Sequence, residues 1–373
     1  MSLVFLPFRW LLRVIRSAAT SPFLTGPLLL AVTYYPDAVR RVVLDLASRV
    51  PGLHAPPSNL NFSTATTALC VLFALGVASK LNGVLNTMAA NSWRLRAVKG
   101  WDWPKEIAVV TGGSSGIGRL VAEKLAALGV RVAVLDVQKM PEAMESNPRI
   151  HFFDCDVTSY ESVAQAADAI RQDIGHPSIL INNAGIISGV VPILKIPESG
   201  LRQIMGVNTL SHWFTAQHFI PHMVEMNKGH VVTVASIASF VTLPTVAHYS
   251  ASKASAHTFH EALTVELKYY HKAPNILTTV VHPNFARTPL IEKFVPLLER
   301  SGLSLLSTND VAEPIVAQIK SCRGGQLILP DSLSLISGIR GWPTWLQMIL
   351  LDGLGKGTAK LARYVKKQKQ ANK

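Results

Sequence analysis

The chain has 373 residues, of which 49% are hydrophobic and 16% are charged, with three cysteines and a formal net charge of +13. This length supports a sizeable core, and the low charged fraction argues against a disordered chain. Three cysteines without a CxxC pair argue against a disulfide scaffold and against a structural zinc site.

The positive charge lies in the two flanks of the chain. Residues 1–100 hold ten Lys/Arg and two Asp/Glu, and residues 351–373 hold seven and one. The intervening residues 101–350 hold nineteen basic and twenty acidic residues and are nearly neutral. Because the basic flanks adjoin apolar segments, the charge indicates membrane lipid rather than a nucleic acid as the partner.

Two long stretches near the N-terminus, 17–36 and 50–79, contain no Asp, Glu, Lys or Arg. A bilayer span needs roughly 20 predominantly apolar residues. Residues 61–79 meet this requirement as a spanning helix. The stretch 17–36 contains Pro22, Gly26 and Pro27, and it fits a kinked span, a re-entrant segment or an interfacial segment. A buried core helix is the alternative, but nothing before Lys80 resembles a surrounding domain.

Basic residues flank both apolar stretches. Arg9, Arg13 and Arg16 interrupt the N-terminus at helical spacing, which favours an amphipathic surface helix over a cleaved signal peptide. The second stretch is followed by Lys80, Arg94, Arg96 and Lys99. By the positive-inside rule these residues hold the downstream domain in the cytosol. If both stretches span, residues 37–61 are lumenal, with the sequon that begins at Asn61.

Strands and helices alternate from Trp101 onward. Residues 107–110 and 131–135 predict buried strands around a helix at 119–128. Further strands are predicted at HFFDCDV, SILINNAG, GHVVTVAS and ILTTVVHP. This alternation predicts an α/β fold with a doubly wound parallel sheet, the Rossmann fold. The expected organisation is a membrane-anchoring region (1–100), a single catalytic domain (101–330), and an apolar and then basic tail at the membrane surface (331–373).

A glycine-rich turn, TGGSSGIG at 111–118, joins the first strand to the first helix of this domain. Small residues at Gly112, Gly116 and Gly118 let backbone amides and the helix N-terminus receive a pyrophosphate. The turn alone is a weak signal, since such turns also occur without ligands. A P-loop is excluded because Arg119 stands where that motif requires Lys.

Asp136 closes the second strand, where its carboxylate can accept hydrogen bonds from a ribose. The same charge repels a 2′-phosphate, so NAD is the predicted cofactor. Arg119 and Lys139 keep NADP as an alternative.

The most informative motif is YSASK, with Tyr249 and Lys253 one helical turn apart and Ser236 thirteen residues before the tyrosine. A phenol acts as a base near neutrality only if its pKa falls by roughly 3 units, which is about 4 kcal/mol. Lys253 and an oxidised nicotinamide would both stabilise the phenolate. Ser236 would hydrogen-bond the substrate oxygen.

At this point the chain resembles the short-chain dehydrogenase/reductase family over roughly residues 101–330. The glycine turn, Asp136, Asn208, Ser236 and YSASK occur in the order and spacing of that family. The resemblance implies four catalytic residues, in which Asn208 holds a proton-relay water: Asn208, Ser236, Tyr249 and Lys253. It also implies a set of cofactor-binding residues: Gly112, Ser114, Ser115, Gly116, Ile117, Gly118, Asp136, Asp156, Val157, Asn183, Ala184, Gly185, Tyr249, Lys253, Pro283 and Thr288.

The loop after the sixth strand departs from the family. Many members carry Pro-Gly there, whereas this chain has Pro283-Asn284-Phe285, similar to the membrane-bound retinol and hydroxysteroid dehydrogenases. Asn284 leaves the geometry of the loop open. The following segment, 289–307, would form either an apolar lid over a hydrophobic substrate or an ordinary surface helix.

These observations predict a membrane-anchored oxidoreductase that acts on a lipophilic alcohol or ketone of retinoid, steroid or long-chain type. The alternatives are an NADPH-dependent keto-lipid reductase and a catalytically idle membrane or lipid-droplet scaffold. The expected location is the endoplasmic reticulum or a lipid droplet, with the catalytic domain facing the cytosol and a homodimer left open. No metal site is predicted, because no carboxylate or cysteine joins His218 and His222.

Overall fold

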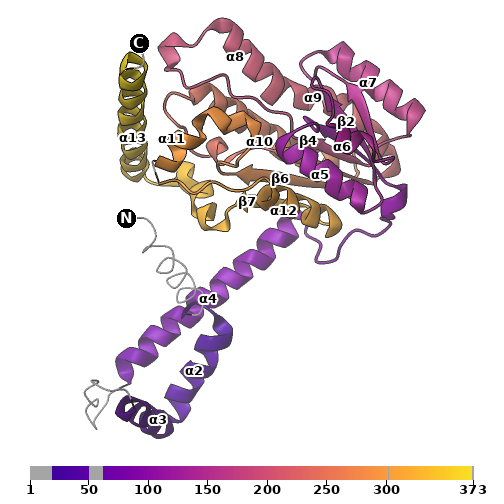
Figure 1. Ribbon diagram of the computed structural model, residues 1–373. Helices are drawn as coiled ribbons and strands as arrows, with labels where there is room; N and C mark the ends of the chain where they lie inside the picture. Colours follow the sequence, from indigo (N-terminus) through magenta and orange to yellow (C-terminus); the bar gives the residue numbers. More distant parts are fainter. Residues whose placement is uncertain (1–18, 50–61, 301, 372–373) are drawn as a thin grey trace. The chain divides into compact units, whose positions relative to one another are not determined.

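A computed structural model of the protein describes residues 19–49, 62–300 and 302–371 (Figure 1). The chain divides into two compact units, Met1–Met88 and Ala89–Lys373. The surface helix predicted in the first 17 residues and Asn61 of the sequon lie outside the described residues.

In its described residues the first unit holds the helices α2 (Pro22–Tyr34) and α3 (Pro36–Ser48) and most of α4 (Ser63–Ala90). Among the described residues, α4 is the helix whose length and composition suit a bilayer crossing. Its most apolar window of 18 residues has a mean hydropathy of 1.8, and only 6% of that window is buried. A soluble core helix would bury far more of its apolar surface. The helix α2 is apolar but shorter, with 13 residues.

The second unit is built on seven parallel strands in the order β3-β2-β1-β4-β5-β6-β7. The strands are β1 (Ile107–Thr111), β2 (Arg131–Asp136), β3 (Ile150–Asp154), β4 (Ile179–Asn182), β5 (Gly229–Val234), β6 (Ile276–Pro283) and β7 (Gly325–Leu329). The predicted doubly wound sheet is confirmed, and the structure adds β7 at its edge. The reversal of strand order between β1 and β4 creates a crevice at the carboxyl ends of these strands.

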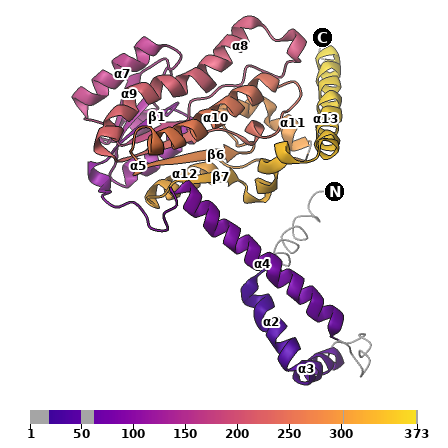
Figure 2. The same cartoon turned by 180° about the vertical axis from the view of Figure 1, so that it is seen from behind.

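Helices cover both faces of the sheet (Figures 1 and 2). The longer ones are α5 (Gly116–Ala127), α7 (Tyr160–Asp173), α8 (Glu198–Met205), α9 (Ser211–Met226), α10 (Ala247–Tyr269), α12 (Asn309–Lys320) and α13 (Thr344–Ala371). The shorter ones are η1 (Trp103–Lys105), α6 (Glu142–Glu145), η2 (Ile193–Lys195), η3 (Gly206–Leu210), η4 (Ile237–Ser239), η5 (Pro289–Phe294), α11 (Val295–Arg300) and η6 (Asp331–Gly341). One core lies between the sheet and α5, α6 and α12. A second core lies between the sheet and α7, α9 and α10.

The central strands are short apolar runs because both of their faces are covered. All five residues of β1 and all eight of β6 are buried. Parallel strands buried on both faces are rich in Val, Ile and Leu rather than alternating. The edge strand β7 is only partly buried, so its pattern is weaker.

Segments outside the sheet complete the second unit. Residues 89–100 pack with the catalytic unit, since the Arg94 guanidinium donates to Asn275 Oδ1 at 2.5 Å and Val98 N donates to the Cys322 carbonyl at 2.9 Å. At the other end of the chain, Ile339 of η6 is buried against Phe240, together with side chains from α13. The C-terminal segment therefore belongs to the fold beside the catalytic motifs.

A buried carboxylate joins three loops at the amino edge of the sheet. Glu106 is 3% exposed and accepts hydrogen bonds from Ser178 Oγ and Lys228 Nζ, both at 2.5 Å, and from Asp102 N at 3.1 Å. Lys228 also lies 5.1 Å from the centre of the Trp101 ring. These contacts hold together the chain segments that enter β1, β4 and β5.

Replacing Lys228 with Met should destabilise the catalytic unit, because it leaves the buried Glu106 carboxylate without its cation. Breaking a fully buried pair costs about 3–5 kcal/mol. Lys228 is partly exposed, so we expect a loss of about 2 kcal/mol, or roughly 4–8 °C in Tm. Thermal unfolding of the full chain in detergent measures the loss. Lys124→Met is the control, because its partner Glu313 is exposed, and an equal loss in both variants would contradict the role of burial.

Candidate active site

The glycine turn begins where β1 ends and runs directly into α5. Gly112 and Gly116 adopt φ angles of +63° and +56°, which side-chain-bearing residues rarely adopt. A Cβ on Gly118 would lie 2.3 Å from the Gly112 carbonyl oxygen. The predicted helix starts three residues earlier than its apolar pattern suggested, at Gly116, so the helix N-terminus lies within the turn itself. This backbone cradle fits the pyrophosphate of a dinucleotide.

Asn183 fixes the turn against the end of β4. Its Nδ2 donates to the carbonyl oxygens of Thr111 and Gly112, at 3.0 and 3.1 Å. In return, Thr111 Oγ1 accepts hydrogen bonds from the backbone amides of Asn183 and Ala184, both at 3.0 Å. The two strands that border the crevice are therefore locked together at their carboxyl ends.

Asp136 lies at the end of β2, beside the turn. Its carboxylate accepts hydrogen bonds from the amides of Ser114 and Gln138, both at 3.0 Å. Arg119 forms an ion pair with Glu123 at 2.8 Å. The cation nearest in sequence to the turn is therefore already paired, which weakens the case for a 2′-phosphate site.

The other expected cofactor residues follow neighbouring strands. Asp156 is exposed after β3, and its Oδ1 accepts from Thr158 N at 2.9 Å, while Val157 is 8% exposed in the core. Pro283 ends β6. A Cβ on Gly116 would lie 3.5 Å from Thr288, so Thr288 lies against the glycine turn. These residues all surround the carboxyl edge of the sheet.

Ser236 and Tyr249 meet at this edge from different elements. Ser236 follows β5 and caps η4, where its Oγ accepts from Ala238 N at 3.1 Å. Tyr249 projects from the first turn of α10, and its phenol is hydrogen-bonded to Ser236. Burial raises the pKa of Tyr249, whereas the hydrogen bond with Ser236 lowers it. The depression required of a base must therefore come from neighbouring positive charge.

Lys253 supplies such a charge one turn further along α10. It is 3% exposed, and its Nζ donates to the Val234 carbonyl at 2.8 Å. Burial lowers the pKa of Lys253 to about 8, so the ammonium form predominates at neutral pH. A Cβ on Gly185 would lie 3.4 Å from this Nζ, so the backbone after β4 passes close to the ammonium.

Asn208 lies in η3, a π-helical turn between α8 and α9. Its side chain is fully buried and bonded on both sides: Oδ1 accepts from Ile186 N at 2.8 Å, and Nδ2 donates to Ile186 O and Ser252 Oγ, both at 3.0 Å. Asn208 thus connects the segment after β4 to the helix that carries Tyr249 and Lys253. The water relay implied by the family resemblance remains a prediction.

Two residues that sequence reasoning overlooked form hydrogen bonds with the loop that carries Ser236. His282 Nδ1 is 2.9 Å from Ser239 Oγ and 3.2 Å from the Ser236 carbonyl, and burial lowers the pKa of His282 to about 3. Arg340 of η6 donates to the carbonyls of Ser239 and Phe240, at 3.0 and 3.3 Å. Arg340 lies beyond the recognised motifs, and no local pattern marks it.

The segment 289–307 forms two short helices, η5 and α11, rather than one long surface helix. Ile291 is buried, and Leu290, Phe294 and Val295 are half-buried. Asn284, which departs from the family pattern, donates its backbone N–H to Leu329 O at 2.8 Å and so joins the loop to β7. The apolar segment 289–307 therefore begins shortly after β6, at the carboxyl edge of the sheet where Ser236 and Tyr249 also lie.

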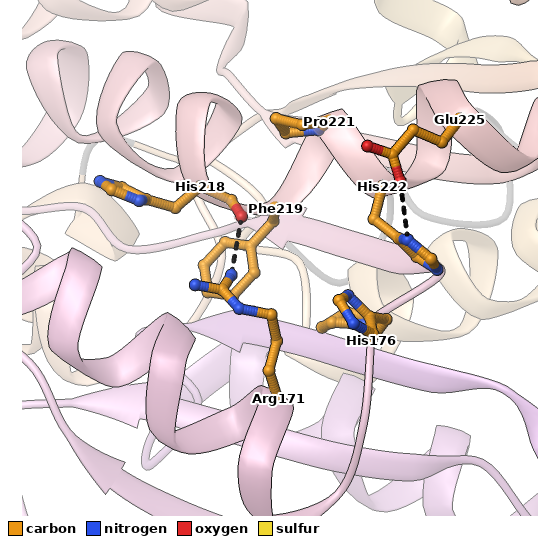
Figure 3. Close-up of a pocket in the computed structure, with 8 residues that line it drawn as sticks. Arg171, His176, His218, Phe219, Pro221, His222 and Glu225 are labelled. Atoms are coloured by element: carbon orange, nitrogen blue, oxygen red, sulfur yellow. Dashed lines mark hydrogen bonds and ion pairs between the residues drawn. The ribbon is translucent and has the colours of Figure 1, made fainter.

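A cavity of about 190 Å³ lies elsewhere, between the end of α7, the loop before β4, and α9 (Figure 3). The ring centres of His176 and His222 are 4.0 Å apart there, and His222 Nδ1 lies 3.3 Å from Glu225 Oε2. The cavity is at the amino end of β4, opposite the catalytic edge. No group of three potential metal ligands occurs in residues 19–49, 62–300 and 302–371.

The comparisons with known proteins agree with this geometry. The family model for short chain dehydrogenase matches residues 106–296. Dehydrogenase RED2 of Cochliobolus heterostrophus is 37% identical over 244 residues, which cover 64% of this chain and 90% of RED2. Epidermal retinol dehydrogenase 2 of Homo sapiens is 35% identical over 208 residues, which cover 52% of this chain and 67% of that protein.

A solved structure shares the fold. The 3-ketoacyl-(acyl-carrier-protein) reductase from Brucella melitensis, complexed with NADH, matches with a TM-score of 0.55 and 24% identity. The match covers 61% of this chain and 98% of the reductase. The second unit accordingly shares the fold of this reductase.

Replacing Arg340 with Ala should displace the Ser236 loop and lower kcat by about tenfold, since small displacements of positioning groups are costly in rate. The KM for the cofactor should not change, because Arg340 contacts only the loop carbonyls. Arg340→Lys should restore part of the rate. Arg323→Ala is the control, since Arg323 donates to the distant Leu95 carbonyl. Steady-state kinetics in which kcat is retained, or in which both variants lose it equally, would contradict the role of Arg340.

Proposed function

The chain belongs to the short-chain dehydrogenase family and is an NAD(P)-dependent oxidoreductase, and from this premise we propose that it is anchored to a membrane and interconverts a lipophilic alcohol and its ketone or aldehyde. The observation that carries the proposal is the convergence of Ser236, Tyr249 and Lys253 at the carboxyl edge of the sheet, with Asn208 behind them.

The proposed mechanism uses these side chains to move one proton. In the oxidative direction Tyr249 removes the hydroxyl proton, and Ser236 holds the substrate oxygen beside the phenol. The Lys253 ammonium, one helical turn away, would stabilise the phenolate by electrostatic attraction. A nicotinamide cofactor, when bound, would supply the hydride acceptor for the substrate carbon. The backbone cradle of the glycine turn, with Thr288 beside it, would hold this cofactor.

A lipophilic substrate is supported by the surroundings of the site. Ile193 and Leu194 of η2 are 69% and 97% exposed, and Leu303 beyond α11 is 43% exposed. Exposed apolar side chains on the segments that follow β4 and α11 suit a substrate that partitions into lipid. The human relative is named for retinol, which is such a molecule.

We assign NAD as the preferred cofactor and the cytosolic face of the endoplasmic reticulum or a lipid droplet as the location. The Asp136 carboxylate supports NAD, because it would repel a 2′-phosphate. The apolar helix α4 and the basic residues that follow it support cytosolic placement of the catalytic unit. The helix α13, with Trp345 and Ile349 exposed, is proposed to rest on the membrane surface.

Replacing Tyr249 with Phe should lower kcat by at least about a hundredfold, because it removes the acid/base group. Cofactor binding, measured by quenching of intrinsic fluorescence, should persist. Tyr269→Phe, near the end of the same helix and exposed, is the control and should keep full activity. If Tyr249→Phe abolished turnover but kept the cellular effect of the protein, the scaffold alternative would replace this proposal.

A substrate panel tests the substrate class and the cofactor together. The wild-type enzyme should oxidise long-chain, isoprenoid or steroid alcohols with NAD, and it should turn over a water-soluble sugar far more slowly. Asp136→Asn keeps a hydrogen-bond acceptor but removes the charge, so the ratio of kcat/KM should shift toward NADP by about tenfold. Comparable turnover of sugar and lipid would overturn the substrate class. An unchanged cofactor ratio would overturn the role of Asp136.

A further inference from the structure

Two glycines allow α2 and α4 to approach closely in the first unit. A Cβ on Gly76 of α4 would lie 2.3 Å from the Thr20 carbonyl oxygen and 3.1 Å from the Pro22 ring. A Cβ on Gly26 of α2 would lie 3.1 Å from the Phe73 ring. Helix pairs in bilayers are held together by such close contact at small residues.

These contacts define an antiparallel register. Pro22 lies beside Gly76 and Gly26 lies beside Phe73, so residue numbers rise along α2 as they fall along α4 (Figures 1 and 2). Continuing the register places Tyr34, the last residue of α2, at the level of Ala65, close to the start of α4. Toward the other end, the first charged residue of α4 is Lys80, and the charge-free stretch around α2 begins after Arg16. The register therefore places the end of α2 level with the start of α4, and by the same count along the sequence Arg16 corresponds to a position near Lys80.

We propose that α2 and α4 cross the membrane together as a helical hairpin, so that the N-terminus lies on the same side as the catalytic unit. The proposal rests on the membrane attachment put forward above and adds its topology. The helix α2 has 13 residues, which rise about 20 Å, and the charge-free residues on either side of it extend the apolar stretch to twenty residues, 17–36. In α4, the 17 steps from Ser63 to Lys80 rise about 26 Å, and the Lys80 side chain can extend to the interface.

Lipid is the occupant that fits the outer faces of the hairpin. Outward-facing apolar side chains are strongly exposed, among them Phe23 (81%), Leu30 (58%) and Leu75 (56%). The buried residues of α2 are Thr25 and Val32. The Thr25 hydroxyl donates a hydrogen bond to the Ser21 carbonyl at 2.9 Å. A polar group satisfied within its own helix is compatible with a hydrocarbon environment.

The helix α3 has the character of an interfacial helix at the far side of the hairpin. Tyr34 and Tyr35 precede it and are 71% and 69% exposed, as expected of aromatic anchors at a membrane surface. Two ion pairs lie along it, Arg40 with Asp37 and Arg49, just past its end, with Asp45. The apolar residues Val42 and Leu46 remain exposed, at 57% and 56%, which suits a helix lying in the headgroup region.

The distribution of basic residues sets the orientation. The N-terminal 16 residues contain three arginines, and residues 80–99 contain four further basic residues, with no acidic residue in either segment. The connection between the two stretches, 37–61, contains three arginines and two aspartates. The positive-inside rule therefore places both flanks in the cytosol and α3 in the lumen.

Cysteine labelling of the full chain in sealed microsomes tests this topology. In a variant with Cys70 and Cys322 replaced by Ser, cysteines are introduced singly at Ser2 and Ser58. A membrane-impermeant maleimide should label position 2 in sealed vesicles and position 58 only after permeabilisation. Labels that report the same side at both positions would overturn the hairpin. If carbonate extracts the protein and both positions are labelled, membrane attachment itself fails, and that outcome is distinguishable from failure of the topology alone.

The Gly76→Leu variant tests whether the hairpin requires close packing between α2 and α4. The matched control is Gly83→Leu, seven residues further along the same face of α4, where a Cβ would meet no atom within 4 Å. Both changes add the same apolar side chain. We expect Gly76→Leu to lose the opposite-side labelling of positions 2 and 58, and Gly83→Leu to keep it. Opposite-side labelling that survives in both variants would overturn the role of the glycine contact.

Discussion

The geometry of the active site depends on the clamp between the glycine turn and β4. Asn183 binds the carbonyls of Thr111 and Gly112, and this fixes the strand ends that border the crevice. The chain continues from this clamp through Gly185 to Ile186, which holds the side chain of Asn208. Asn208 in turn holds Ser252, the neighbour of Lys253. Hydrogen bonds and the short backbone segment 183–186 thus connect the proposed pyrophosphate cradle to the helix that carries Tyr249 and Lys253.

A second support comes from parts of the chain that follow the shared family region. The loop that carries Ser236 contacts two side chains from elsewhere in the chain. Its residue Ser239 is hydrogen-bonded through Oγ to His282, and the Ser239 carbonyl accepts a hydrogen bond from Arg340 of η6. The pKa of His282 is low because the ring is buried, so the ring stays neutral and acts as a fixed hydrogen-bonding group rather than as a charge. The C-terminal segment therefore contributes to the catalytic geometry even though it carries no recognisable motif.

Sequence reasoning identified β1 to β6 because each is a short run rich in apolar residues, and it placed Tyr249 and Lys253 on one helical face because their spacing dictates it. It missed β7, an edge strand whose partial burial leaves a mixed pattern. It also expected a phenol with a depressed pKa, whereas the protein alone raises that pKa by burial. Long-range contacts such as that of Arg340 with the Ser236 loop leave no trace in local spacing, so only the folded chain reveals them.

The π-helical turn at Gly206–Leu210 has a consequence for how this site tolerates change in chain length. A π turn holds one residue more than an α turn, so it corresponds to a single insertion within an otherwise regular helix. Removing one residue there would restore regular winding and rotate everything on one side of the deletion by about 100° relative to the other. Asn208 would then face away from Ile186 or lose Ser252. The extra residue therefore lets Asn208 form hydrogen bonds with both Ile186 and Ser252, which lie in different directions.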